Sequence, residues 1–186
     1  MTTRTVRSRD DVVRTAGKLF AERGYHGTSM RDLAAELGLL GSSLYSHITS
    51  KEDLLVEVVE KGARLFQSSA DAALAKSGTP ANRLKALVGG HVDVVLDHLD
   101  EVRTFLNEAG ALDEVHRSRI LAARDRYEAS YREVLSEMKV ANPKLAVIFL
   151  LSILNALERW YRPTGPLGRE ELVDEILRFA GAGMRR

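Results

Sequence analysis

Residues 28–53 read TSMRDLAAELGLLGSSLYSHITSKED. The spacing of apolar and capping residues in this stretch is the strongest indication of the fold of the chain. A hydroxyl side chain, Thr28 or Ser29, precedes a short helical pattern of apolar residues, and Gly38 permits the left-handed backbone that leaves this helix. A second short helix is expected over about residues 42–47. Two short helices joined by a tight turn are typical of a helix-turn-helix, whose second helix enters the major groove of DNA.

The rest of the chain carries the same helical periodicity. Four prolines and no strand-like alternation of β-branched residues predict an all-α protein. Ser50, with Asp53 three residues later, resembles a capping box that opens a long helix, and residues 77–80 form the clearest break. Helices are expected over about residues 10–23, 28–37, 42–47, 50–76, 81–98, 101–109, 113–140, 143–162 and 169–184.

Composition narrows the class of protein. The 186 residues are 45% hydrophobic and 28% charged, which is enough to build a core, and there is no cysteine for a disulfide or thiolate metal site. The first residues lack the apolar segment of a secretory signal, and the apolar run at 145–157 is too short to span a bilayer. We therefore expect a cytoplasmic protein with no membrane partner. Residues 1–51 carry a net charge of +3 and the remainder −2, which favours a DNA-binding head on a body that does not bind DNA.

The head carries side chains suited to a DNA duplex. The Tyr45 hydroxyl can donate to a phosphate, and Lys51 adds positive charge at a helix start, where anions bind. Thr28 and Ser29 can offer hydroxyls and helix-start amides to a phosphate, and short donors over residues 42–47 can reach base edges or the backbone. Arg4, Arg7 and Arg9 form a basic tail for phosphate or minor-groove contacts. The predicted DNA contacts are Thr28, Ser29, Met30, Arg31, Ser42, Ser43, Tyr45, His47 and Lys51. Alternatively, these are surface residues of a helical bundle, with Leu44 and Tyr45 both in its core.

This head resembles the TetR family of transcriptional regulators. The resemblance is carried by LFAERGY at 19–25, TSMRDLA at 28–34, Gly38, LYSH at 44–47 and SKEDLL at 50–55. It implies a two-fold dimer of about nine helices, with a helix-turn-helix DNA-binding domain over residues 1–50 and a ligand-binding and dimerisation domain over residues 51–186. The chain departs from the family pattern at Leu40 and Gly41, where a hydroxyl residue often caps the recognition helix. No arginine lies in the predicted recognition helix, so direct reading of guanine by that helix is expected to be limited.

One stripe of the helix expected over 113–140 suggests a pocket. Ile120, Arg124, Tyr127, Tyr131, Val134 and Met138 share this stripe. An arginine on an inward face needs an anionic partner or a water-filled cavity. Arg124 is thus either a ligand anchor beside the two tyrosines, or a member of an internal ion pair with Glu108 or Asp93, or a side chain that reaches solvent along its stem.

The helix expected over residues 145–161 is apolar on nearly all sides. That pattern predicts burial against both the body and a second copy of the chain. Apolar residues of the last helix are expected to join it in a four-helix dimer interface: Leu172, Val173, Ile176, Leu177 and Phe179. The alternative is a monomer that buries the apolar helix within itself.

A second, weaker resemblance concerns the ligand. RWYRP at 159–163, GPL at 165–167 and the GLLGSSLY form of residues 38–45 are similar to TetR regulators of fatty acid, phenylacetate and sterol breakdown, which sense acyl-coenzyme A thioesters. The resemblance implies an acyl-CoA effector with no other cofactor, held by an apolar cavity with arginines near its mouth. The predicted ligand contacts are Phe66, His91, Arg103, Phe105, Arg124, Tyr127, Tyr131, Arg159 and Trp160. Each aromatic residue and His91 can equally be a satisfied part of the core.

No catalytic motif or metal-ligand spacing is evident in the sequence, so we expect no enzyme activity. The sequence predicts a homodimeric repressor that binds an inverted-repeat operator and is released by a small hydrophobic effector. Two alternatives remain, which are a constitutive architectural DNA binder without an effector and a regulator of an efflux gene that senses a drug-like ligand.

Overall fold

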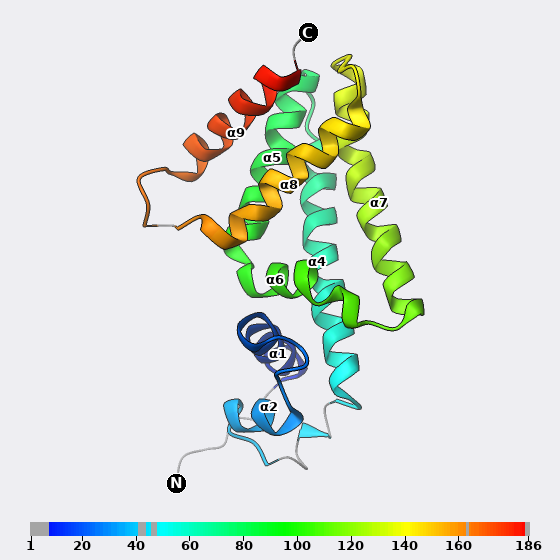
Figure 1. The fold of residues 1–186 in the computed structure, drawn as a ribbon, viewed down its shortest axis with the longest axis vertical. Coiled ribbons are helices and arrows are strands. Elements are labelled where there is room, and N and C mark those ends of the chain that lie inside the picture. The colour runs from blue at the N-terminus through cyan, green and yellow to red at the C-terminus, as the bar shows by residue number, and fades with distance from the viewer. Residues whose placement is uncertain (1–7, 41–43, 46–47, 163, 185–186) are drawn as a thin grey trace. The chain divides into compact units, whose positions relative to one another are not determined.

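The computed structural model describes residues 8–40, 44–45, 48–162 and 164–184 (Figure 1). Over these ranges the protein is all-α, as predicted, with eight α-helices, one 3₁₀ turn and no strand. The ninth helix, predicted over 42–47, lies mostly outside the described residues. No described helix is long and apolar enough to cross a membrane. The elements are α1 (Arg9–Arg23), α2 (Met30–Glu36), α4 (Lys51–Leu74), α5 (Pro80–Asp97), α6 (Leu99–Asn107), η1 (Ala109–Ala111), α7 (Glu114–Glu137), α8 (Pro143–Trp160) and α9 (Arg169–Met184).

Contacts divide the chain into two compact units that interleave along the sequence. The first unit holds residues 1–62 and 100–120, and the second holds residues 63–99 and 121–186. Both α4 and α7 therefore begin in the first unit and end in the second. The predicted domain boundary after residue 50 stays a prediction.

Local capping explains where the first helices begin and end. The Ser8 hydroxyl accepts from the Asp11 amide at 3.2 Å and so opens α1, and Gly24 ends it with a φ of 76°. The long α4 begins as predicted, because the Ser50 hydroxyl accepts from the Asp53 amide at 3.0 Å. Sequence alone could place these termini because each depends on residues only a few positions apart.

The first unit is closed by α6, which packs closely on α1 and α4. The Thr104 hydroxyl donates to the carbonyl of Gly17 on α1 at 3.2 Å. A Cβ at Gly62 of α4 would lie 2.8 Å from the Cβ of Phe105, so only glycine permits this approach. The chain thus returns to the head region after residue 100, which the sequence did not predict.

The second unit is built around α5, which contacts both α8 and α9 (Figure 1). Thr79 caps α5 with Pro80 in its first turn, and Asn142 caps α8 with Pro143 in the same position. Large apolar side chains from the buried faces of α5, α7 and α8 form the core: Leu84, Leu87, Val88, Val134, Leu135, Val147, Leu150 and Leu154. The core is also where most of the predicted ligand residues of this unit lie.

Candidate DNA interface and ligand site

Leu44 and Tyr45 differ sharply in exposure. Leu44 is fully buried, whereas 58% of Tyr45 is exposed, so the alternative that places both residues in the core is wrong for Tyr45. The phenol is therefore accessible to a phosphate, as the DNA hypothesis requires. The predicted contacts Ser42, Ser43 and His47, and the tail residues Arg4 and Arg7, lie outside the described residues.

The hydroxyls of Thr28 and Ser29 form hydrogen bonds within the head. Thr28 is only 1% exposed, and its hydroxyl is 2.9 Å from the Gly24 carbonyl and 3.3 Å from that of Leu19. Ser29 is exposed but forms a capping box with Asp32, in which its amide donates to the carboxylate at 2.9 Å. The expectation that their hydroxyls and the amides of the helix start serve a phosphate stays a prediction, and in the described head both hydroxyls already have partners within the chain.

The Lys51 side chain forms hydrogen bonds with the loop before α2. Its ammonium donates to the carbonyls of Tyr25 at 2.9 Å and Thr28 at 2.8 Å, and lies 4.1 Å from the centroid of the Tyr25 ring. An ammonium has three donors, so one remains for another acceptor. Lys51 therefore ties the start of α4 to the α1–α2 loop, and its positive charge stays beside that helix start. Sequence reasoning overlooked Tyr25 here, because the contact joins residues 26 positions apart.

The remaining charged residues of the head divide into paired and solvent-facing groups. Arg9 forms an ion pair with Glu57, and Lys18 pairs with Glu36 at 3.0 Å. Arg31 is exposed on α2, and Met30 beside it is half-buried. Arg31, Tyr45 and the capping residue Ser29 are thus the predicted DNA contacts that are exposed in the described part of the head.

Four of the nine predicted ligand residues come together as a buried aromatic cluster. Phe66 of α4 lies 4.7 Å from His91 of α5 and 5.4 Å from Tyr127 of α7, measured between ring centroids. Tyr131, one turn after Tyr127, is 5.4 Å from it in an edge-on arrangement. We call Phe66, His91, Tyr127 and Tyr131 the aromatic cluster; each is at most 9% exposed.

Hydrogen bonds run through the aromatic cluster. The Tyr131 hydroxyl donates to the Leu87 carbonyl at 2.9 Å and lies 3.2 Å from the Tyr127 hydroxyl, which in turn is 2.9 Å from Nδ1 of His91. Burial lowers the pKa of His91 to about 3, although the nearby Asn155 side chain opposes this shift. Burial likewise raises the pKa values of Tyr127 and Tyr131, so all three groups are neutral at physiological pH. Asn155, which forms a side-chain hydrogen bond with His91, is a further residue of the site that the sequence did not predict.

Arg159 and Trp160 lie apart from the aromatic cluster. Both are exposed at the end of α8, and Arg159 donates to the buried carboxylate of Glu158 at 3.0 Å. Arg103 and Phe105 belong to α6 in the first unit, where Phe105 is buried and Arg103 is half-buried.

Arg124 is half-buried on α7. Burial lowers its pKa, while the charge of Glu128 one turn later raises it. Of the two predicted ion-pair partners, Asp93 is bonded to Arg169 instead. Met138, at the end of the predicted stripe, is 38% exposed and does not continue the buried face.

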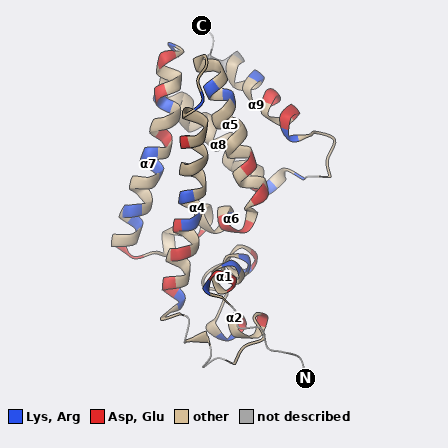
Figure 2. Ribbon diagram, turned by 180° about the vertical axis from the view of Figure 1, so that it is seen from behind, with Lys and Arg blue, Asp and Glu red and all other residues tan. Residues whose placement is uncertain are grey.

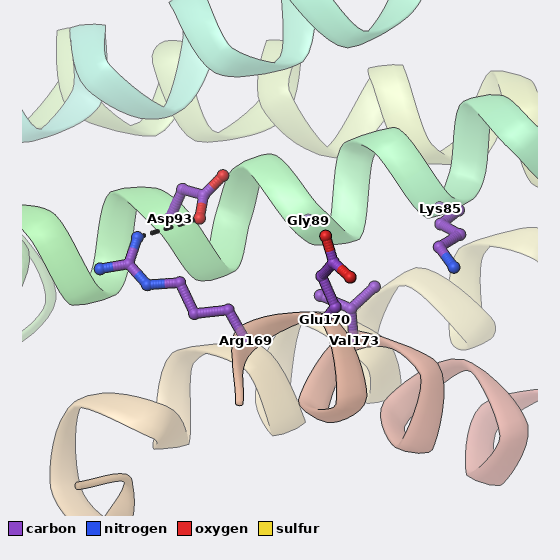
Figure 3. A pocket seen from close by; sticks show the side chains of 6 residues that line it. All are labelled: Lys85, Gly89, Asp93, Arg169, Glu170 and Val173. Atoms are coloured by element: carbon purple, nitrogen blue, oxygen red, sulfur yellow. Dashed lines mark hydrogen bonds and ion pairs between the residues drawn. The ribbon is translucent and has the colours of Figure 1, made fainter. Parts of the chain in front are cut away.

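A shallow pocket of about 150 Å³ lies between α5 and α9 (Figure 3). In Figure 3 the Arg169 side chain reaches across to Asp93, and its guanidinium also bonds Asp97 at 3.0 Å. Lys85 and Asp174 add a third ion pair, at 2.5 Å, between the same helices. Four of its six lining residues are charged, and Arg169 and Lys85 bond aspartates between the two helices, so we interpret this pocket as a contact between α5 and α9 and not as a site for an acyl chain.

A helix-turn-helix head joined to a separate helical unit defines a class of DNA-binding transcriptional regulators. Residues 12–58 match the family described as bacterial regulatory proteins, tetR family, and residues 77–184 match the tetracyclin repressor-like C-terminal domain. The chain therefore belongs to the TetR family, which confirms the resemblance seen in its sequence.

Known relatives span nearly the whole chain. The HTH-type transcriptional repressor KstR2 of Mycobacterium tuberculosis is 26% identical over 96% of this chain and 93% of its own length. The TetR family regulator PfmR of Thermus thermophilus superposes with a TM-score of 0.83 at 31% identity, over 94% of this chain and 99% of PfmR. The regulator AibR, solved in complex with isovaleryl coenzyme A and operator DNA, gives a TM-score of 0.83 at 26% identity, over 92% of this chain and 96% of AibR.

Proposed function

We propose that this regulator is a homodimeric repressor that binds an inverted-repeat operator and releases it when an acyl-CoA binds its second unit. The observation that carries the proposal is the similarity to AibR, whose structure holds both isovaleryl coenzyme A and operator DNA, over 92% of this chain. The similarity to the KstR2 repressors supports repression over activation. Since these relatives are regulators, they also fit the expected lack of enzyme activity.

Operator binding is assigned to the helix-turn-helix head. The exposed phenol of Tyr45 and the guanidinium of Arg31 supply phosphate contacts, and Lys51 contributes charge while it holds the start of α4 in place. Ser42, Ser43 and His47 are proposed to reach base edges. A dimer places two such heads about 34–36 Å apart, at successive major grooves on one face of the duplex.

Dimerisation is assigned to α8, whose charged residues are Lys144, Glu158 and Arg159 (Figure 2 colours the charged residues along the ribbon). Leu145, Ile148 and Phe149 are 39%, 45% and 62% exposed, and the last two follow Leu145 by three and four residues, so the three share one stripe of this helix. On α9 only Phe179, at 72%, is a large exposed apolar residue among those described. Such an exposed apolar stripe marks a protein interface, and a second copy is the occupant that the two-fold operator requires.

The predicted share of α9 in that interface needs correction. Leu172, Val173 and Ile176 are at most 6% exposed in the single chain, because α9 packs with them against its own neighbours. Leu177 is half-buried, so Phe179 is the main residue that α9 offers to a partner. An amphipathic pattern shows that a face is buried, but it does not show which chain buries it.

Effector binding is assigned to the second unit near the aromatic cluster. Its apolar rings suit an acyl chain, and the half-buried Arg124 supplies positive charge for the phosphates of coenzyme A. Arg159 and Trp160 of the same unit remain proposed contacts, whereas Arg103 and Phe105, which belong to the first unit, stay predictions. Because α4 starts in the head and ends in the second unit, we propose that a movement of this helix transmits effector binding to the head and so releases the operator.

An electrophoretic shift on the gene's own upstream DNA, with a panel of CoA thioesters, tests the proposal. We expect a complex that one thioester dissociates and free CoA does not. A parallel thermal-shift screen should show that thioester raising the melting temperature by several degrees. DNA binding that no compound alters would favour an architectural protein, and release by drug-like compounds alone would favour an efflux regulator.

A further inference from the structure

Leu40 is an apolar residue at a helix start, where a polar side chain is ordinarily found. Its carbonyl accepts a hydrogen bond from the Leu44 amide at 3.3 Å, so Leu40 occupies the N-cap position of the turn that carries Leu44 and Tyr45. A leucine cannot satisfy the free amides of that turn, as a hydroxyl or carboxamide side chain would. Leu40 is also 64% exposed, so it forgoes capping without gaining burial.

The apolar residues around Leu40 do not share its exposure. Leu37 and Leu44 are 5% and 0% exposed, because they belong to the core of the head. Among the described residues from 8 to 62, the large apolar residues that remain exposed are Leu40 and Tyr45. A residue that neither caps a helix nor packs in a core breaks two local rules at once, and such breaks are expected where a side chain serves binding.

The turn before Leu40 is closed by its own backbone. Gly38 has a φ of 66°, and the Leu39 amide donates to the Ala34 carbonyl at 2.8 Å. The position of Leu40 relative to α2 is therefore set by the backbone of this turn. In a helix-turn-helix the N-terminal residues of the second helix contact base edges in the major groove. Leu40 is thus held at the end of that helix that meets the bases.

We propose that Leu40 contacts the C5-methyl group of a thymine in each half of the operator. This inference rests on the proposed function, in that it requires the head to bind operator DNA through its second short helix. The thymine methyl is the apolar feature of the base edges in the major groove, and an aliphatic side chain reads it by contact alone. Leu40 therefore adds a base preference that hydroxyl donors do not supply, in a head whose predicted recognition helix has no arginine.

Replacing thymine by uracil removes this methyl group and leaves every hydrogen-bonding group of the base in place. The probe is the segment of the gene's own upstream DNA that the protein protects from nuclease digestion. Symmetry-related thymines of the two half-sites are replaced in pairs, and binding of the full-length protein is measured by fluorescence anisotropy. We expect one pair at which uracil weakens binding about fifteenfold, or about fourfold per half-site, which is the scale of one buried methyl group.

Matched variants identify Leu40 as the side chain involved. Leu40→Ala should bind the thymine duplex about as weakly as wild type binds the uracil duplex, and it should not distinguish the two. Because no charge is removed, its binding should weaken with salt as steeply as that of wild type. Leu121→Ala, at a leucine of α7 that is 53% exposed, is the control and should keep both the affinity and the uracil effect. Tyr45→Phe should weaken binding to both duplexes equally, since a phosphate contact does not depend on the base.

The outcomes separate this inference from the proposed function. Salt-sensitive binding with no uracil effect, or with one that persists in Leu40→Ala, overturns the inference and leaves operator binding in place. A Leu40-dependent uracil effect without release by any thioester supports the inference, while the acyl-CoA part of the proposed function fails. Absence of salt-sensitive binding to the upstream DNA overturns both. Leu40→Ser, whose hydroxyl can cap the turn, should lose the uracil effect as well, which guards against a folding defect in Leu40→Ala.

Discussion

The buried imidazole of His91 should make the protein lose stability in mild acid. The unfolded chain takes up a proton on this ring below the ordinary pKa of 6.5, whereas the folded ring, with a pKa of about 3, does not. The stability from this group is therefore complete above about pH 6.5 and is lost as pH falls toward about 3. Between about pH 7.5 and pH 5 the difference in bound protons lowers the free energy of unfolding by about 2 kcal/mol.

Urea unfolding at these two pH values, at one fixed protein concentration, measures the loss. Carboxylates also contribute to acid sensitivity, so the informative quantity is the difference between wild type and His91→Asn. The variant should show a pH dependence smaller by about 2 kcal/mol, whatever its stability at neutral pH. His26→Asn, at an exposed histidine, supplies the matched control for the substitution itself. Equal pH dependence in wild type and His91→Asn would refute the reasoning.

Three further predictions concern the head and the proposed dimer. Tyr45→Phe should weaken operator binding about tenfold by fluorescence anisotropy, because a phosphate contact is lost, while light scattering shows an unchanged dimer. Thr28→Val should lower the free energy of unfolding by about 1–3 kcal/mol in urea, because it strips the Gly24 and Leu19 carbonyls of a buried donor; equal stability would contradict this role. Phe149→Asp should shift the protein toward monomer in light scattering, since it places a charge on the proposed interface, and an intact dimer at low concentration would locate the interface elsewhere.

The sequence predicted features that depend on near neighbours. Thr79 with Pro80, Asn142 with Pro143 and the capping residue Ser50 marked helix starts that the structure confirms, because capping involves positions only a few residues apart. The family motifs of the head could be recognised for the same reason, because each consists of residues that are close together in the sequence.

Features that depend on distant contacts could not be predicted in the same way. Thr28 was predicted to contact a phosphate, and its hydroxyl also lies 3.3 Å from the Leu19 carbonyl, nine residues earlier, which the sequence did not indicate. Lys51 was placed correctly at a helix start, but its carbonyl partners lie 23 and 26 residues earlier. The sequence predicted that Tyr127 and Tyr131 share one stripe of a helix. It did not predict the hydrogen bond between the Tyr127 hydroxyl and His91, because His91 lies on another helix.

A titration of labelled upstream DNA by anisotropy, over a range of salt concentrations and then with acyl-CoA thioesters, addresses both halves of the proposed function at once. We predict that binding weakens steeply as salt rises, because phosphate contacts release counterions, and that a thioester dissociates the complex while free CoA leaves it intact. Association that is absent or insensitive to salt would contradict the assignment of the head to operator DNA. Binding that no thioester alters would contradict the assignment of an acyl-CoA effector to the second unit.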